Sequence, residues 1–168
     1  MKNILNDKKL NEAIDFFVEQ EKTNNYKNIT LELNLGCQNV DSTTIPYYIL
    51  KLFIARFKKI IVKLPCNEPD ATEIFLYCYN LGVRTFNICN TLKTDNGSES
   101  SRRIQDFSLK LIEDITNLFK DVVIIGGGGM YTSDDVKRYR EAGADGFSIS
   151  TGILKPWNIP GIINEVYK

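Results

Sequence analysis

The sequence predicts an α/β fold in which parallel strands alternate with helices around one sheet. Short runs typical of strands recur about five times along the 168 residues, and helical patterns separate them with short connections. Glycine turns follow the last two of these runs, as in folds that bind phosphate at strand ends. No linker, repeat or low-complexity segment interrupts the pattern, so residues 1–168 are predicted to form a single domain.

The predicted strands are short and rich in apolar residues. The first alternates strictly between apolar and polar residues, as a half-buried strand does, and the second is a β-branched run that stops at Pro65. The later runs are buried in character. The predicted strands cover residues 28–35, 59–64, 83–90, 122–125 and 146–150.

The predicted helices carry apolar residues at helical spacing. Gly82 is the expected terminator of one helix, and Ser133 is the expected cap of another, whose end is marked by Gly143. The polar stretch 93–101 is expected to be one long loop, placed after a strand end where active-site loops belong. The predicted helices cover residues 10–18, 45–57, 69–80, 103–119, 133–143 and 160–167.

Charge and hydropathy exclude several classes of partner. Lys and Arg total 21, and Asp and Glu also total 21, so no overall field attracts nucleic acid or an anionic membrane. No apolar run approaches the ~20 residues needed to span a bilayer, and the first residues lack the apolar core of a signal peptide. A cytoplasmic location is therefore predicted.

The cysteines predict thiols rather than a metal site. The four cysteines are widely spaced, and there is no histidine to complete a zinc set. Cys37 and Cys89 stand at strand ends, where a thiol could ionise or move a proton. Cys78 lies within an apolar helical run and is predicted to belong to the core.

Polar residues gather where the predicted strands end, and ligands of parallel α/β folds bind at these carboxyl ends. Each residue alone has an ordinary alternative: an asparagine that caps a turn, or a lysine that is a solvated charge at a strand edge. Their order along the chain favours a common site. These residues are Asn34, Cys37, Asn39, Lys63, Asn90 and Thr91.

The glycine segments 124–129 and 143–152 predict a phosphate cradle. Glycine lets the backbone adopt positive φ and pass close to an anion, and amides at the start of the next helix can point at the phosphate oxygens. A phosphorylated cofactor or substrate is the expected ligand. The alternative for residues 126–129 is a flexible loop without a ligand.

Taken together, these segments resemble the dihydroorotate dehydrogenase family of flavin-dependent (β/α)8 barrels. Residues 31–40 resemble the family's motif in which an Asn, a catalytic Cys or Ser and a second Asn line the substrate site. Residues 61–65 resemble the segment whose lysine contacts the flavin ring, and Asn90-Thr91 resembles the step that holds the pyrimidine. The glycine segments resemble the FMN phosphate site.

The resemblance implies an enzyme of pyrimidine biosynthesis that oxidises dihydroorotate to orotate with FMN as cofactor. Cys37 would then be the catalytic base, and a Cys at this position resembles the soluble class of the family. Substrate binding is assigned to Asn34, Asn39, Asn90 and Thr91, and cofactor binding to Lys63, Gly127, Gly128, Gly129, Ser150 and Thr151.

The resemblance covers the segments that correspond to strands 4–8 of a TIM-type barrel. The N-terminal barrel strands are absent, so a partial barrel is expected. Four interpretations remain open. The chain is a diverged enzyme completed by self-association, a subunit completed by a separate chain, a noncatalytic FMN- or phosphate-binding half-barrel, or another phosphate-binding barrel enzyme. Gly36 and Gln38 replace a small polar residue and a proline of the family motif, which predicts a less rigid loop around Cys37.

Overall fold

The structure is a computed structural model. It describes residues 30–35, 47–66, 70–89, 91–94 and 97–168, together with residues 8, 11, 12, 15, 16, 19, 20 and 22. The isolated N-terminal positions are helical. The apolar residues that predicted a helix over 10–18 lie outside the described residues, so that prediction is not tested.

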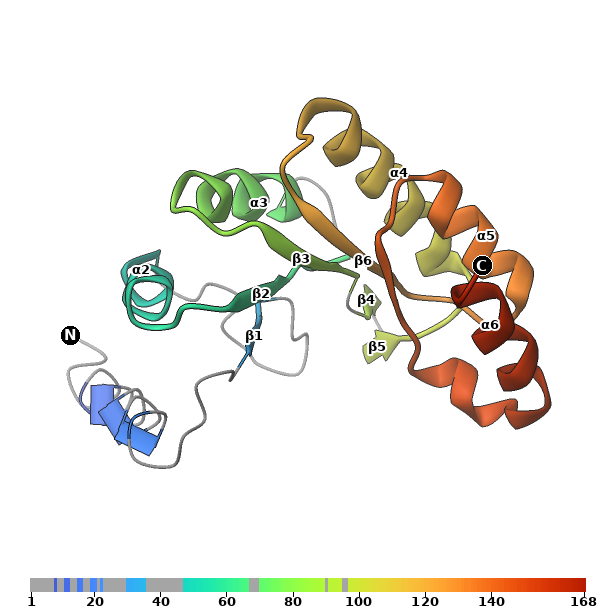
Figure 1. The fold of residues 1–168 in the computed structure, drawn as a ribbon, viewed down its shortest axis with the longest axis horizontal. Coiled ribbons are helices and arrows are strands. Elements are labelled where there is room, and N and C mark those ends of the chain that lie inside the picture. The colour runs from blue at the N-terminus through green and yellow to red at the C-terminus, as the bar shows by residue number, and fades with distance from the viewer. Residues whose placement is uncertain are drawn as a thin grey trace.

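Five parallel strands form one sheet in the order β1-β2-β3-β6-β7 (Figure 1). Every neighbouring pair in this sheet is parallel. The α/β prediction and the five predicted strands are therefore confirmed, with the ends of the strands shifted by a few residues. The strands are β1 (Leu31–Asn34), β2 (Ile60–Lys63), β3 (Thr85–Ile88), β6 (Val123–Gly127) and β7 (Gly146–Ser148).

Helices follow the strands and lie around the outer side of the curved sheet (Figure 1). Two short 3-10 helices after β7, which the sequence analysis did not anticipate, connect the sheet to the last helix. The helices are α2 (Tyr47–Arg56), α3 (Asp70–Asn80), α4 (Arg103–Leu118), α5 (Ser133–Glu141), η1 (Thr151–Leu154), η2 (Pro156–Asn158) and α6 (Ile159–Val166).

The core lies between the sheet and these helices. Val62, Phe86 and Ile124 share one register position on neighbouring strands, and all three are fully buried. The ring of Phe86 lies 4.6 Å from the ring of Phe75 in α3, so this face of the sheet packs on the helices. Cys78 of α3 is also fully buried, and burial raises the pKa of its thiol to about 12. The assignment of Cys78 to the core is confirmed.

Of two predicted helix ends, the structure confirms the terminator of α3 and corrects the N-cap of α5. Gly82 has φ +96° and ends α3, as expected for a left-handed glycine after a helix. The predicted cap at Ser133 is wrong, because Thr132 is the N-cap of α5. Its backbone is extended, its hydroxyl accepts a hydrogen bond from the amide of Asp135, and the Asp135 carboxylate accepts one from the Thr132 amide.

The stretch 93–101 is not one irregular loop. It contains part of an antiparallel hairpin between β4 (Leu92–Thr94) and β5 (Gly97–Glu99), on the opposite side of the sheet from the helices in Figure 1. Within the described ranges, no helix combines the length and the apolar character needed to cross a bilayer.

Candidate functional site

Three polar side chains form a row at the carboxyl ends of β1, β2 and β3. Asn34 is the register partner of Lys63, and Lys63 is the register partner of Asn87. Register partners in a parallel sheet lie about 4.8 Å apart and point to the same face. Because the preceding residue Phe86 faces α3, this row lies on the face away from the helices.

Asn87 is the buried member of the row, and the sequence analysis missed it. Its side chain is 5% exposed, and its Nδ2 donates a hydrogen bond of 2.8 Å to Oε2 of Glu32 in β1. Its Oδ1 is buried and has no hydrogen-bond partner among the described residues. A buried acceptor without a donor is uncommon in folded proteins, so Asn87 Oδ1 is a candidate to accept a hydrogen bond from a ligand.

The first glycine turn is held by a tyrosine of α5. The Tyr139 hydroxyl donates a shared hydrogen bond to the carbonyl oxygens of Gly127, at 2.9 Å, and Gly128, at 2.5 Å. In a trans peptide the N–H points opposite to the carbonyl of the preceding residue. The amides of Gly128 and Gly129 therefore point away from Tyr139, and neither donates to a described residue. Burial raises the pKa of Tyr139, so the hydroxyl keeps the proton that it donates.

The backbone of this turn requires glycine. Gly128 has φ +95° and Gly129 has φ +64°, both in the left-handed region. A Cβ on Gly128 would lie 2.6 Å from Cγ2 of Ile104, and a Cβ on Gly129 would lie 2.8 Å from the carbonyl oxygen of Ser101. The turn is thus packed closely against the start of α4 and presents backbone amides rather than side chains. This packing favours a fixed turn over a flexible loop at these residues, and the phosphate-binding role of the turn remains a prediction.

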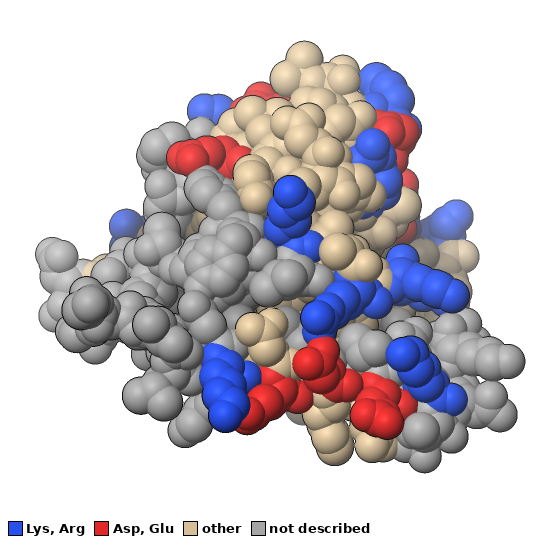
Figure 2. All heavy atoms as spheres, turned by 90° about the vertical axis from the view of Figure 1, so that its left-hand side faces the viewer, with Lys and Arg blue, Asp and Glu red and all other residues tan. Residues whose placement is uncertain are grey.

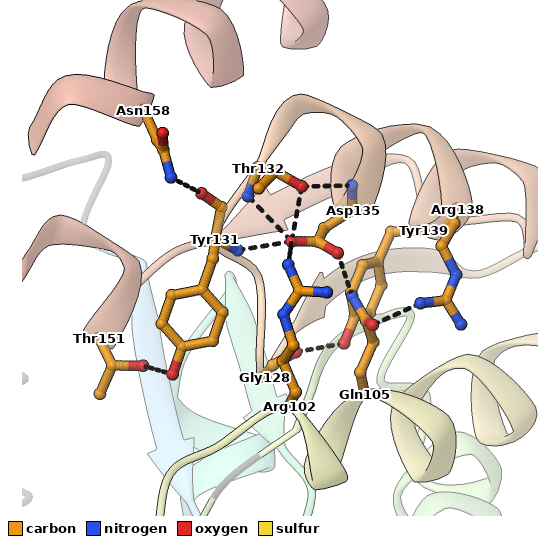
Figure 3. Close-up of polar contacts among 10 residues, drawn as sticks. All are labelled: Arg102, Gln105, Gly128, Tyr131, Thr132, Asp135, Arg138, Tyr139, Thr151 and Asn158. Carbon is orange, nitrogen blue, oxygen red and sulfur yellow. Dashed lines mark hydrogen bonds and ion pairs between the residues drawn. The ribbon is translucent and has the colours of Figure 1, made fainter. Parts of the chain in front are cut away.

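A buried carboxylate fixes the segment after the turn (Figure 3). Oδ2 of Asp135 accepts hydrogen bonds from the amides of Tyr131, at 2.8 Å, and Thr132, at 2.9 Å, and from the Thr132 hydroxyl. Its Oδ1 accepts from Nε2 of Gln105 in α4 at 2.9 Å. Burial acts to raise the pKa of Asp135, but these hydrogen bonds outweigh it and the pKa is lowered. Asp135 is therefore an ionised structural anchor.

The second turn joins the first through Tyr131. The hydroxyl groups of Tyr131 and Thr151 lie 3.1 Å apart, and Nδ2 of Asn158 donates to the Tyr131 carbonyl at 2.9 Å. Thr151 Oγ1 also lies 3.5 Å from Oγ of Ser100, at the end of the hairpin. Three segments from distant parts of the sequence therefore meet beside Tyr131, which the sequence analysis did not identify.

The predicted site residues that the structure describes lie at the same end of the sheet. Asn34 and Lys63 belong to the polar row, Thr91 connects β3 to β4, and residues 127–129, 150 and 151 form the two turns. Cys37, Asn39 and Asn90 lie outside the described residues, so their predicted roles remain predictions. Tyr139 and Asp135 could not be assigned from the sequence, because both act through tertiary contacts.

A separate cleft of about 440 Å³ lies at the opposite end of the first three strands. Its lining includes Lys58, Lys59 and Arg84 together with apolar residues. Ligands of parallel α/β proteins bind at the carboxyl ends of strands, so the polar row and glycine turns are the better candidate site. On the face toward α2, basic and acidic side chains are interspersed (Figure 2).

The fold is that of a (β/α)-barrel-type protein, and the candidate functional groups lie at the carboxyl ends of its strands. The family model described as dihydroorotate dehydrogenase matches residues 3–168. The chain belongs to the dihydroorotate dehydrogenase family.

Curated relatives are similar over most of this chain. Dihydroorotate dehydrogenase B (NAD(+)), catalytic subunit, from Thermococcus kodakarensis is 27% identical over 173 residues, covering 94% of this chain and 55% of the relative. The protein of the same name from Bacillus mycoides is 28% identical over 160 residues, covering 81% of this chain and 52% of the relative. The chain therefore spans about half the length of the curated relatives it matches.

Solved structures agree on the fold. The crystal structure of DHODH from Eimeria tenella in complex with ferulenol matches with a TM-score of 0.72 and 17% identity, covering 91% of this chain and 53% of that one. The ligand-free enzyme from the same organism matches with a TM-score of 0.70. The five-stranded sheet corresponds to about half of a TIM-type barrel, which confirms the predicted partial barrel.

Proposed function

We propose that this chain binds FMN at the carboxyl ends of its strands and takes part in the oxidation of dihydroorotate to orotate in pyrimidine biosynthesis. Family membership supports the reaction class. The polar row and the glycine turns support the location. Relatives similar to this chain are named as catalytic subunits of dihydroorotate dehydrogenase B, and the motif around Cys37 resembles the Cys-type class of the family.

The observation that carries this proposal is the hydrogen bond from Tyr139 to the carbonyls of Gly127 and Gly128. It turns two consecutive amides away from the core, where they are free to donate to phosphate oxygens. Ser150 and Thr151, at the second turn, are the proposed partners on the other side of the phosphate. The backbone groups and the hydroxyl of Thr151 suit an anion that carries several acceptor oxygens.

FMN, when bound, supplies hydride acceptance, which no side chain of the protein can provide. We assign Lys63 to the flavin ring, where its ammonium group stabilises negative charge. Cys37 removes a proton from the substrate carbon next to the one that loses hydride, a step worth ~10²–10⁴-fold as general-base catalysis. Asn34, Asn39, Asn90 and Thr91 hold the polar edge of the pyrimidine by hydrogen bonds.

A second candidate function is a noncatalytic FMN- or phosphate-binding half-barrel, or a subunit completed by a partner chain. The observation that favours it is the strand order, in which β1 and β7 are the outer strands of the described sheet. Outer strands offer backbone groups that pair readily with another strand. The candidate partners are a second copy of this chain and a separate chain that supplies further strands.

Turnover with dihydroorotate separates the two candidates. Cys37→Ala is expected to abolish oxidation while FMN remains bound at the wild-type stoichiometry, and Cys37→Ser is expected to retain measurable turnover because the family motif accepts either residue. Unchanged turnover in Cys37→Ala would contradict the assignment of the base. A wild-type protein that binds FMN without oxidising dihydroorotate would favour the binding function.

A further inference from the structure

Two cationic side chains converge on the ring of Tyr131. The guanidinium carbon of Arg102 lies 5.9 Å from the ring centroid, and Nζ of Lys155 lies 5.3 Å from it. Arg102 precedes α4, whereas Lys155 follows η1, so residues 53 positions apart meet at one aromatic ring. The resemblance to the family did not identify either cation.

Each cation is adjacent to one of the glycine turns. A Cβ on Gly129 would lie 3.1 Å from Cα of Arg102, and Figure 3 shows the guanidinium of Arg102 beside the Asp135 carboxylate, at the segment that follows this turn. On the other side, the amide of Lys155 donates to the Gly152 carbonyl at 3.0 Å. Arg102 therefore borders the first turn and Lys155 borders the second.

The charges of this pair are poorly balanced by neighbouring carboxylates. Among the described residues, the carboxylate that forms an ion pair with Arg102 is that of Asp135, whose Oδ2 lies 3.4 Å away and already accepts three shorter hydrogen bonds. Lys155 is exposed and forms no ion pair with a described residue. Two like charges near one ring repel each other, and an anion bound close to both would offset that repulsion.

We propose that Arg102 and Lys155 bind the phosphate of the ligand in the glycine cradle and select phosphorylated over unphosphorylated ligands. This inference rests on the proposed function for the phosphate cradle, and it adds side chains to the backbone amides described there. The amides bind any well-placed oxygen, whereas the two cations respond to the charge of a phosphate monoester, close to −2 at neutral pH. Tyr131 keeps both cations beside the turns.

Titration with two flavins tests whether Arg102 and Lys155 select the phosphorylated ligand. Fluorescence titrations of the full chain with FMN and with riboflavin would compare wild type, Arg102→Gln, Lys155→Gln and the double variant. Each single variant is expected to weaken FMN binding about tenfold and to leave riboflavin binding within about twofold, because riboflavin lacks the phosphate. Arg103→Gln and Lys110→Gln remove exposed charges elsewhere on α4 and should not change either affinity.

The outcomes separate this inference from the proposed function. If wild type binds FMN and the variants keep the wild-type ratio of FMN to riboflavin affinity, the selection by Arg102 and Lys155 is overturned while FMN binding stands. A second measurement uses thermal unfolding in inorganic phosphate against sodium chloride of equal ionic strength. Stabilisation by phosphate that is lost in the double variant, in a protein that does not bind FMN, would support the two cations and reject the flavin. No response to either ligand would overturn both.

Discussion

Nδ2 of Asn87 donates a hydrogen bond of 2.8 Å to Oε2 of Glu32, and this bond joins β3 to β1 above the intervening strand β2. The bond fixes the orientation of the amide, so that the buried Oδ1 is the atom left for another donor. Lys63 of β2 is the register partner of Asn87. The amide and the ammonium group therefore belong to one polar surface at the strand ends, beside the proposed flavin ring.

Replacing Asn87 with Asp tests this bond. The variant removes the donor and places a second carboxylate against Glu32, so the free energy of unfolding should fall by about 2 kcal/mol at pH 7. The loss should shrink as the pH is lowered and one carboxyl of the pair becomes protonated. Urea unfolding at pH 7 and pH 4.5 would measure both effects. Asn80→Asp, at the exposed end of α3, is the matched control, and an equal loss in both variants would contradict the bond.

Tyr139→Phe removes the hydroxyl that holds the first glycine turn and keeps the buried ring. The carbonyls of Gly127 and Gly128 lose their donor, so the free energy of unfolding should fall by about 1 kcal/mol. FMN affinity should fall about tenfold, because the amides of Gly128 and Gly129 are no longer held in one direction. Tyr167→Phe, at a ring that is 87% exposed, should change neither quantity. Equal FMN affinity in both variants would contradict the role of Tyr139.

Gly128→Ala introduces a Cβ where φ is +95° and Ile104 Cγ2 is 2.6 Å away. The free energy of unfolding should fall by about 1–3 kcal/mol through backbone strain and the clash, and FMN binding should weaken. Gly161→Ala is a matched control, because its Cβ would meet nothing within 4 Å and α6 favours alanine. That variant should be stabilised by up to about 1 kcal/mol. Similar effects of the two changes would show that the turn does not need glycine at 128.

Asp135 predicts a specific acid sensitivity. Its pKa is lowered in the folded protein, so its contribution to stability is complete above the unfolded value near ~3.9 and is lost as pH falls through the lower folded value. Between pH 5 and pH 2, wild type should lose stability more steeply than Asp135→Asn, measured by urea unfolding at each pH. Asp134→Asn changes the exposed neighbour and should keep the wild-type slope. A wild-type slope in Asp135→Asn would contradict the anchor role.

The sheet could be predicted because its strands carry their own local signals. The β-branched run of β2 and the apolar run of β6 are each recognisable without knowledge of their neighbours. The hairpin of β4 and β5 was missed because its strands are three residues long and polar, which is too short for a periodic pattern. The cap of α5 was placed one residue late, because Ser133 and Thr132 are chemically equivalent candidates.

The site was predicted less completely than the sheet. Asn34 and Lys63 are the last residues of their strands, and the glycine turns stand at or just after strand ends, so topology alone brings them to one end of the sheet. Tyr139 and Asn87 act through contacts that depend on how α5 and β1 pack, and no sequence period reports such contacts. The roles of Cys37, Asn39 and Asn90 remain predictions.

The most direct test of FMN binding is the visible absorbance spectrum of the freshly purified protein, followed by heat release of any flavin and titration of the stripped protein with FMN. We predict bound FMN at about one molecule per chain, with a clear loss in Tyr139→Phe. A colourless protein that also fails to take up added FMN would contradict the proposed cofactor site.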